Sequence, residues 1–179
     1  MRSIGLVALI GLLAAVVKAQ QPQNTSPCVR SESQLFLPLV GKWKVQWTVR
    51  VEPGKYAQTA ATAVIERDSV GCTLVEHFFG ERNGRRFTAM ALLNFGNAEE
   101  LQRVWLDSGH GQFLHFTGAR DGNVIRFQWQ RDLGNRILMV KYEYRAIRPD
   151  SFDTELHLSG DGGKTWEVVE RASYQRQPL

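Results

Sequence analysis

The sequence from position 43 reads Trp43-Lys-Val-Gln-Trp-Thr-Val-Arg-Val51, in which apolar and polar residues alternate almost without a break. This period of two is typical of a β-strand with one buried and one solvated face. Similar short runs, alternating or apolar, follow to the end of the chain, and turn residues separate them. They are Ala60–Glu66, Cys72–Gly80, Arg86–Phe95, Leu101–Asp107, Phe113–Ala119, Val124–Arg131, Ile137–Ile147, Phe152–Leu158 and Trp166–Tyr174.

About ten antiparallel strands in about 140 residues require either a sandwich or a closed barrel. The connections contain Asn83-Gly84, Asp121-Gly122, Gly134-Asn135 and Pro149-Asp150, which favour tight hairpins between successive strands. Only Ser33–Leu39 could form a short helical turn. The sequence therefore predicts an all-β protein, a single antiparallel up-and-down barrel of about ten strands that follows a short helical turn.

Composition and charge exclude several classes of protein. The chain has 179 residues, 43% hydrophobic and 22% charged, which suits one globular domain with a core of ordinary size. Its formal charge of +4 falls to +2 without Arg2 and Lys18, and this excess is too small to predict a nucleic-acid partner. Motifs of the G-x-S-x-G, H-E-x-x-H and C-x-x-C types do not occur, so no catalytic residues can be assigned by motif.

The first residues are typical of a secretory signal peptide. A positive start at Arg2 precedes the apolar run Ile4–Val17, and Val17-Lys18-Ala19 offers a cleavage pattern. An uncleaved N-terminal anchor is the alternative, although the apolar run is short for a membrane span. We expect a signal peptide at 1–19, a flexible lead segment at 20–34, a barrel domain at 35–179 and no stable membrane span after cleavage.

Two cysteines in an exported chain favour one disulfide bond. Cys28 lies in the lead segment and Cys72 opens a strand, so a bond between them would tie the lead segment to the barrel wall. The alternative is two separate buried thiols.

Turn positions fix strand register and so predict which side chains share a face. A turn centred on Asn83-Gly84 pairs Phe78 with Ala89 and Glu76 with Ala91, and later turns pair Phe116 with Phe127 and Phe127 with Val140. The predicted interior comprises Trp43, Val45, Trp47, Leu74, Glu76, Phe78, Val104, Leu106, Leu114, Phe116, Phe127, Trp129, Val140, Tyr142 and Tyr144. The predicted outer face comprises Arg103, Trp105, Asp107, His115, Thr117, Arg126, Gln128 and Lys141.

Two features leave the face assignment open. A single β-bulge would invert part of it and bring polar residues inside. The turn before Phe152–Leu158 also permits two registers. One places Leu156 and Leu158 inside the barrel, and the other places Glu155 and His157 there.

Glu76 is the one carboxylate on the predicted interior face. A carboxylate among apolar residues must be protonated, paired or hydrated. It either bonds to Tyr142 or Tyr144 across the barrel, or it serves as a ligand anchor or a proton-transfer group. The four histidines, at positions 77, 110, 115 and 157, have no metal-ligand spacing, so we expect neither a metal nor a cofactor.

The segment Ser159-Gly-Asp-Gly-Gly-Lys-Thr-Trp166 ends like a phosphate loop, but Leu158 stands where that motif needs its first glycine. It also matches the Asp-box pattern S-x-D-x-G-x-T-W, in which side-chain oxygens satisfy turn amides. One copy in ten strands cannot build a propeller. We predict a local hairpin clasp that depends on Asp161 and Trp166.

Several motifs resemble those of calycins, the superfamily that includes the lipocalins. Gly41-Lys42-Trp43 resembles the opening G-x-W motif, and Tyr174-Gln175-Arg176 resembles the C-terminal pattern whose arginine packs across that tryptophan. Trp105-Leu-Asp107-Ser, Asp150-Ser-Phe152 and the predicted clasp resemble more specifically a family of secreted bacterial lipocalin-like proteins known as a domain of unknown function. The resemblance implies a calycin barrel in the bacterial periplasm and structural roles for Gly41, Trp43 and Arg176. Relatives similar to nitrobindin bind haem through one histidine, but no histidine here lies in a matching motif.

The sequence favours non-catalytic binding of a small, largely apolar molecule inside the barrel. The candidate ligand-binding residues are Trp47, Glu76, Phe78, Phe116, Phe127, Trp129, Tyr142, Tyr144 and His157. The alternative is that the tryptophans fill the interior and leave no cavity. An isomerase, cyclase or hydrolase would use Glu76 with Tyr142, His157 or Glu155. A protein-interaction module would use the outer residues Arg103, Trp105, His115 and Arg126.

Overall fold

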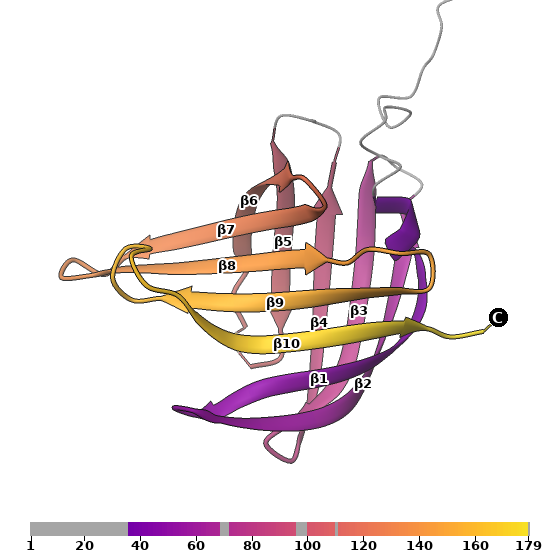
Figure 1. The fold of residues 1–179 in the computed structure, drawn as a ribbon, viewed down its shortest axis with the longest axis horizontal. Helices are drawn as coiled ribbons and strands as arrows, with labels where there is room; N and C mark the ends of the chain where they lie inside the picture. Colours follow the sequence, from indigo (N-terminus) through magenta and orange to yellow (C-terminus); the bar gives the residue numbers. More distant parts are fainter. Residues whose placement is uncertain (1–35, 69–71, 96–99, 110, 179) are drawn as a thin grey trace, which may run out of the picture.

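The computed structural model describes residues 36–68, 72–95, 100–109 and 111–178. It confirms an all-β closed barrel of ten antiparallel strands (Figure 1). A 3-10 turn, η2 (Leu37–Leu39), precedes the first strand. The strands are β1 (Gly41–Glu52), β2 (Lys55–Arg67), β3 (Thr73–Arg82), β4 (Arg85–Asn94), β5 (Leu101–Asp107), β6 (Leu114–Asp121), β7 (Val124–Asp132), β8 (Ile137–Arg145), β9 (Ser151–Ser159) and β10 (Glu167–Arg176).

Each strand pairs with its neighbours in sequence, and β1 pairs also with β10, so the sheet closes on itself. The described residues contain no helix that is long and apolar enough to cross a membrane. The predicted signal peptide (1–19) and the predicted lead segment (20–34), which contains Cys28, lie outside the described residues. Cys72, the predicted disulfide partner of Cys28, is buried immediately before β3. The disulfide bond therefore stays a prediction.

The hairpin between β3 and β4 has the predicted register, with Phe78 opposite Ala89 and Glu76 opposite Ala91. The hairpins around β7 are shifted by two residues from the prediction. Phe127 lies opposite Gly118 and Tyr142, because the turns are centred on 122–123 and on the four-residue loop 133–136. A shift of two keeps every side chain on its predicted face.

The prediction for β5 was wrong. Arg103, Trp105 and Asp107 point into the barrel, because they lie opposite the interior residues Leu93, Ala91 and Ala89 of β4. Val104 and Leu106, predicted to be interior, therefore face outward. This strand has large apolar residues on both faces, so alternation alone does not fix its register.

Strand β9 takes the register that places its leucines inside. Leu156 lies opposite the interior residue Tyr142, whereas His157 lies opposite Lys141 and Glu155 opposite Glu143 on the outer face. The predicted ligand-binding role of His157 is therefore corrected, since its side chain cannot reach the interior.

One end of the barrel is closed by the residues that flank it in sequence. Trp43 is fully buried, and its Nε1 donates a hydrogen bond to the carbonyl oxygen of Leu39 at 2.9 Å. The Arg176 guanidinium carbon lies 4.3 Å from the centre of the Trp43 ring. The guanidinium also donates to the carbonyl oxygens of Val40 and Pro38, at 2.7 Å each, and to that of Pro149. Arg176 thus joins η2, the β8–β9 loop and β10.

Arg176→Ala is expected to lower the free energy of unfolding by about 2–3 kcal/mol, since it removes the cation–π contact and several charge-assisted hydrogen bonds. The melting temperature should fall by about 4–12 °C for a domain of this size. Arg176→Lys should recover only part of the loss, because an ammonium cannot stack as a plane or reach all three carbonyls. Thermal denaturation followed by circular dichroism measures both variants. An unchanged midpoint for the alanine variant, or full recovery by lysine, would contradict this account.

The segment Ser159–Trp166 forms a compact turn at the opposite end. The Asp161 carboxylate accepts hydrogen bonds from the hydroxyl groups of Ser159 (2.7 Å) and Thr165 (2.6 Å) and from the backbone N–H groups of Lys164 and Thr165 (3.0 Å each). These bonds, those from Thr165 first, hold the pKa of Asp161 well below its ordinary value. Trp166 Nε1 donates to the carbonyl oxygen of Gly163 at 3.0 Å. The turn has the geometry of a hairpin clasp.

Candidate functional site

The barrel interior contains a cavity of about 420 Å³ near the end opposite Arg176. Its apolar walls comprise Trp47, Phe78, Phe87, Trp105, Leu114, Phe116, Trp129, Leu138, Val140, Leu156, Leu158, Val169 and Ala172. Its polar lining comprises Arg103, Asp107, Tyr142, Thr154, Glu170 and Tyr174, with Arg50, Arg82, Gln112, Arg131 and Arg171. Eight strands make a barrel that side chains can just fill, and ten strands make a wider one. The tryptophans therefore leave space inside.

The predicted binding residues fall into three groups. Five of them, Trp47, Phe78, Phe116, Trp129 and Tyr142, line the cavity. Glu76, Phe127 and Tyr144 are buried inside the barrel but are not part of the cavity lining. His157 lies on the outer face, as described above. Sequence reasoning missed Arg103, Trp105, Thr154 and Tyr174. The interior carboxylate at position 76 was a signal that some cation should also point inward.

Glu76, Arg103, Tyr142, Tyr144 and Tyr174 form a polar group at the inner side of the cavity, called here the floor cluster. The Tyr174 hydroxyl donates a hydrogen bond to Oε1 of Glu76 at 3.1 Å. Nη2 of Arg103 lies 4.0 Å from Oε2 of Glu76, which allows electrostatic attraction but not a hydrogen bond. Both charged side chains are almost completely buried, with exposed fractions of 2% for Arg103 and 1% for Glu76.

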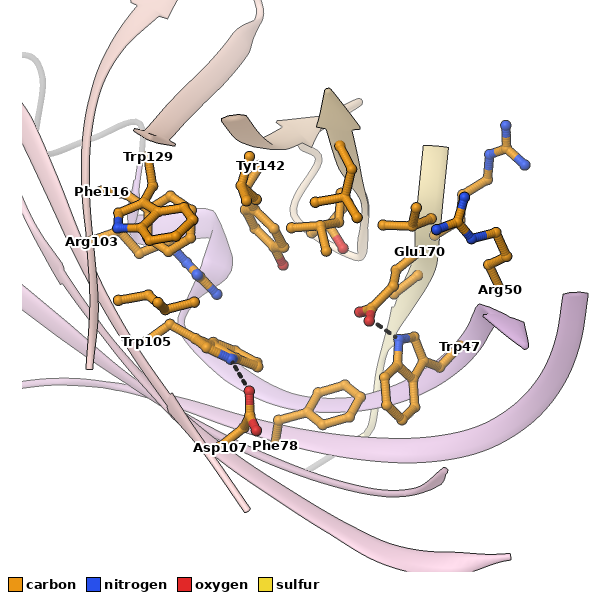
Figure 2. Close-up of a pocket in the computed structure, with 18 of the residues that line it drawn as sticks. Trp47, Arg50, Phe78, Arg103, Trp105, Asp107, Phe116, Trp129, Tyr142 and Glu170 are labelled. Carbon is orange, nitrogen blue, oxygen red and sulfur yellow. Dashed lines mark hydrogen bonds between the residues drawn. The ribbon is translucent and has the colours of Figure 1, made fainter. Parts of the chain in front are cut away.

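Aromatic rings hold the Arg103 guanidinium in place. Its central carbon lies 4.1 Å from the centre of the Tyr142 ring, 4.6 Å from that of Trp105 and 5.7 Å from that of Phe116. Trp105 is itself fixed, because its Nε1 donates to the Asp107 carboxylate at 2.8 Å. Figure 2 shows the guanidinium entering the cavity between Tyr142 and Trp105. Contacts of this kind stabilise a buried cation without using its hydrogen-bond donors.

Four buried polar atoms of the floor cluster form no hydrogen bond of good geometry among the described residues, although the Tyr144 hydroxyl lies close enough to Glu76 and Arg103 to affect the pKa of each. The four atoms are Nε and Nη2 of Arg103, Oε2 of Glu76 and the hydroxyl oxygen of Tyr144. Buried polar groups in proteins are nearly always satisfied by protein, water or ligand. The floor cluster can therefore accept a polar group of a bound molecule.

Burial sets the protonation behaviour of the floor cluster. It raises the pKa of the Glu76 carboxyl, while the positive charge of Arg103 and the hydrogen bond from Tyr174 act in the opposite direction. Burial also raises the pKa of Tyr142 to about 12. The cluster thus combines a permanent cation with one carboxyl group whose pKa is raised above its ordinary value.

Arginines surround the cavity mouth, and several are paired with carboxylates. Arg50 contacts Glu167, and Arg82 lies 3.2 Å from Glu170. Arg171 Nε donates to Glu155 at 3.3 Å. These three arginines therefore already have acidic partners, and Arg131, which also lines the cavity, is exposed to solvent.

A second cluster lies on the outer face of β8 and β9, where ligand atoms of Glu143, Glu155 and His157 lie within 4.8 Å of one another. Arg126 Nε donates to Glu143 at 2.7 Å, and Arg145 Nη1 donates to Glu155 at 2.6 Å. These positive charges oppose the binding of a metal cation, so the group is better described as an ion-pair network. Burial lowers the pKa of His157. This cluster was not predicted from the sequence, because it combines residues of two strands, β8 and β9.

Two solved structures of similar fold are the crystal structure of Rv2717c from M. tuberculosis and the S-type phycobiliprotein lyase CPES from Guillardia theta. The first has a TM-score of 0.57 at 14% identity and covers 83% of this chain and 99% of its own. The second has a TM-score of 0.52 at 11% identity and covers 86% of this chain and 96% of its own. Identities this low show a shared fold alone.

No curated protein matches this chain significantly. A family match covers residues 29–176, which includes every strand of the barrel and both ends of the closure between Trp43 and Arg176. The chain therefore belongs to the family described as "Protein of unknown function (DUF1579)".

Proposed function

We propose that this barrel binds a small, largely apolar molecule in its cavity. The observation that carries the proposal is the cavity itself, about 420 Å³ in volume, with aromatic and aliphatic walls and a few polar groups gathered at one place. Ligand pockets in proteins have this size and this distribution of polar groups. The expected export to the bacterial periplasm, which rests on residues 1–19, is part of the same proposal.

An acid–base enzyme is less well supported. Glu76 does point inward and bonds to Tyr174, but it is not part of the cavity lining. A general acid or base must come within hydrogen-bond reach of its substrate. Glu155 and His157, which the enzyme hypothesis also used, face outward. The likeness to a phycobiliprotein lyase agrees with a barrel that handles small molecules, and at 11% identity it supports nothing finer.

The two remaining alternatives are less well supported. A protein-interaction module would use Arg103, Trp105, His115 and Arg126; the first two point into the barrel, whereas His115 and Arg126 lie on the outer face. Haem ligation from inside the barrel requires a histidine, and none lines the cavity within the described residues. His110 lies outside the described residues.

Binding can be tested with the neutral fluorophore N-phenyl-1-naphthylamine. We expect saturable binding to one site, and native mass spectrometry after incubation with a lipid extract should give one discrete adduct. Leu156→Trp combined with Leu158→Trp fills part of the cavity and should weaken binding of the fluorophore by about tenfold or more, equivalent to about 1.4 kcal/mol. A matched control, Leu92→Trp combined with Leu106→Trp, adds two tryptophans to the outer face and should bind like wild type.

Equal binding by the two double variants would place the fluorophore outside the cavity. Absence of saturable binding by the wild-type protein, for both the fluorophore and the lipid extract, would refute the proposed function. Melting curves of each variant show that it is folded before binding is compared.

A further inference from the structure

We infer that the Arg103 guanidinium binds the acidic head of the cavity's ligand, which makes that ligand a carboxylic acid with an apolar body. This inference rests on the proposed function and names the class of molecule that the same cavity takes.

The first argument is the unused hydrogen-bonding capacity of this guanidinium. A guanidinium presents paired N–H donors whose spacing matches the two oxygens of a carboxylate. Nε and Nη2 of Arg103 are buried and form no hydrogen bond of good geometry among the described residues. Arg103 lines the cavity, and Tyr142 and Trp105 hold its guanidinium group there (Figure 2).

The second argument is that Glu76 does not fill this position. Its Oε2 stays 4.0 Å from Nη2, and its Oε1 is bonded to Tyr174. The Tyr144 hydroxyl lies beside Glu76 and Arg103 without a hydrogen bond of good geometry, and it can add a further donor. At the mouth, by contrast, Arg50, Arg82 and Arg171 already contact carboxylates of this chain. The inner side of the cavity is therefore the better place for an acid.

The third argument concerns charge. With Glu76 ionised, the pair of Glu76 and Arg103 is neutral, and a bound carboxylate would leave one net negative charge in a buried site. Three tyrosines, Tyr142, Tyr144 and Tyr174, face Glu76 from β8 and β10, and its neighbours across β2 and β4 are the apolar Ile65 and Ala91. Of the residues named here around Glu76, Arg103 is the one that carries a positive charge. Binding of the carboxylate is therefore coupled to uptake of one proton from solvent by Glu76.

Decanoate and decanol test the inference, because they share an apolar body and differ in the head group. Both affinities are measured by displacement of N-phenyl-1-naphthylamine between about pH 6 and about pH 8.5, where decanoate stays ionised. Above the pKa of Glu76 in the free protein, decanoate should bind about tenfold more weakly per pH unit, as linkage to one proton requires. Decanol should show no such slope. Calorimetric titration with decanoate in two buffers of different ionisation enthalpy should show that one proton is taken up for each decanoate bound.

Two variants separate the roles of the two charged residues. Glu76→Gln should abolish the pH slope and bind decanoate more tightly than wild type at every pH at which Glu76 is ionised in the free wild-type protein. Arg103→Met should lose about tenfold or more in affinity for decanoate and keep its affinity for decanol. Arg148→Met, an exposed arginine in the β8–β9 loop, is the matched control and should leave both affinities unchanged.

If the fluorophore and decanol bind but Arg103→Met has the same affinity for decanoate as wild type, the inference is wrong. The proposed function would still stand. A pH slope that persists in Glu76→Gln would overturn the proton coupling. If Arg103→Met does not fold, the Glu76→Gln result and the proton count still decide the question. Failure of every probe to bind would instead refute the proposed function.

Discussion

Glu76→Ala is expected to lower the free energy of unfolding by about 3–5 kcal/mol, because it leaves the Arg103 charge buried without a counter-charge. The exposed fraction of the Arg103 side chain is 2%, and an arginine cannot become neutral by losing a proton at any ordinary pH. The melting temperature should fall by about 6–20 °C. Thermal and urea denaturation measure the loss.

Arg103→Met should be milder and should depend on pH, because the remaining Glu76 can take up a proton. Burial raises the pKa of Glu76 in the folded state. A raised pKa contributes stability that is complete below the unfolded value, about 4.3, and is lost as pH rises through the folded value. Removing Arg103 raises the folded pKa further. The deficit of Arg103→Met relative to wild type should therefore be small while Glu76 is protonated in both folded proteins, and should grow by up to about 1.4 kcal/mol per pH unit once the pH exceeds the wild-type pKa of Glu76.

Urea titrations of the two variants between about pH 4.5 and about pH 8 distinguish these behaviours. Equal losses for Glu76→Ala and Arg103→Met at every pH would show that the charge pair has no special energetic role. A pH-independent deficit for Arg103→Met would show that Glu76 does not respond to Arg103.

Gly118→Val is expected to destabilise the barrel by about 2–4 kcal/mol through overpacking. A Cβ atom at Gly118 would lie 2.4 Å from the carbonyl oxygen of Arg126 and 2.6 Å from the Phe127 ring. The first contact is with backbone, so relief requires β6 to move away from β7. The melting temperature should fall by about 4–16 °C. The absence of a side chain at this position is what lets Phe127 fill the space opposite it.

Ala119→Val is the matched control, since it adds the same side chain to the next residue of β6, which is exposed. Valine is well suited to strands, so this variant should stay within about 0.5 kcal/mol of wild type. An equally small change in the free energy of unfolding for Gly118→Val would contradict the prediction. It would mean that a side chain at position 118 fits between β6 and β7.

The strands and most of their faces could be predicted, because a period of two and tight turns are local signals. Asn83-Gly84 fixed the register of β3 and β4 without any knowledge of the rest of the chain. Errors in turn position around β7 shifted the pairing by two residues, which preserves the face. The assignment of β5 failed because its two faces are similarly apolar, so alternation did not show which face is buried.

The candidate site was predictable only in part, because its polar half depends on contacts between distant strands. The inward orientation of Trp47, Phe78 and Trp129 could be predicted from the alternation of apolar and polar residues alone. A buried arginine is rare, so composition argues against placing Arg103 inside until its partner Glu76 is considered. Tyr174 reaches Glu76 from the last strand, 98 residues away in sequence, and no local pattern reports such a bond.

The closure between β1 and β10 has a consequence for the rates of folding and unfolding. Nine of the ten strand pairings join successive strands, and only this one joins residues as distant as Trp47 and Ala172. Distant pairings form late because the loop they close costs entropy. Trp47, Val169, Ala172 and Tyr174 come from these two strands and line the cavity, so the cavity exists only after closure. A bound molecule therefore slows the opening of the barrel, while the hairpins form at the same rate with or without it.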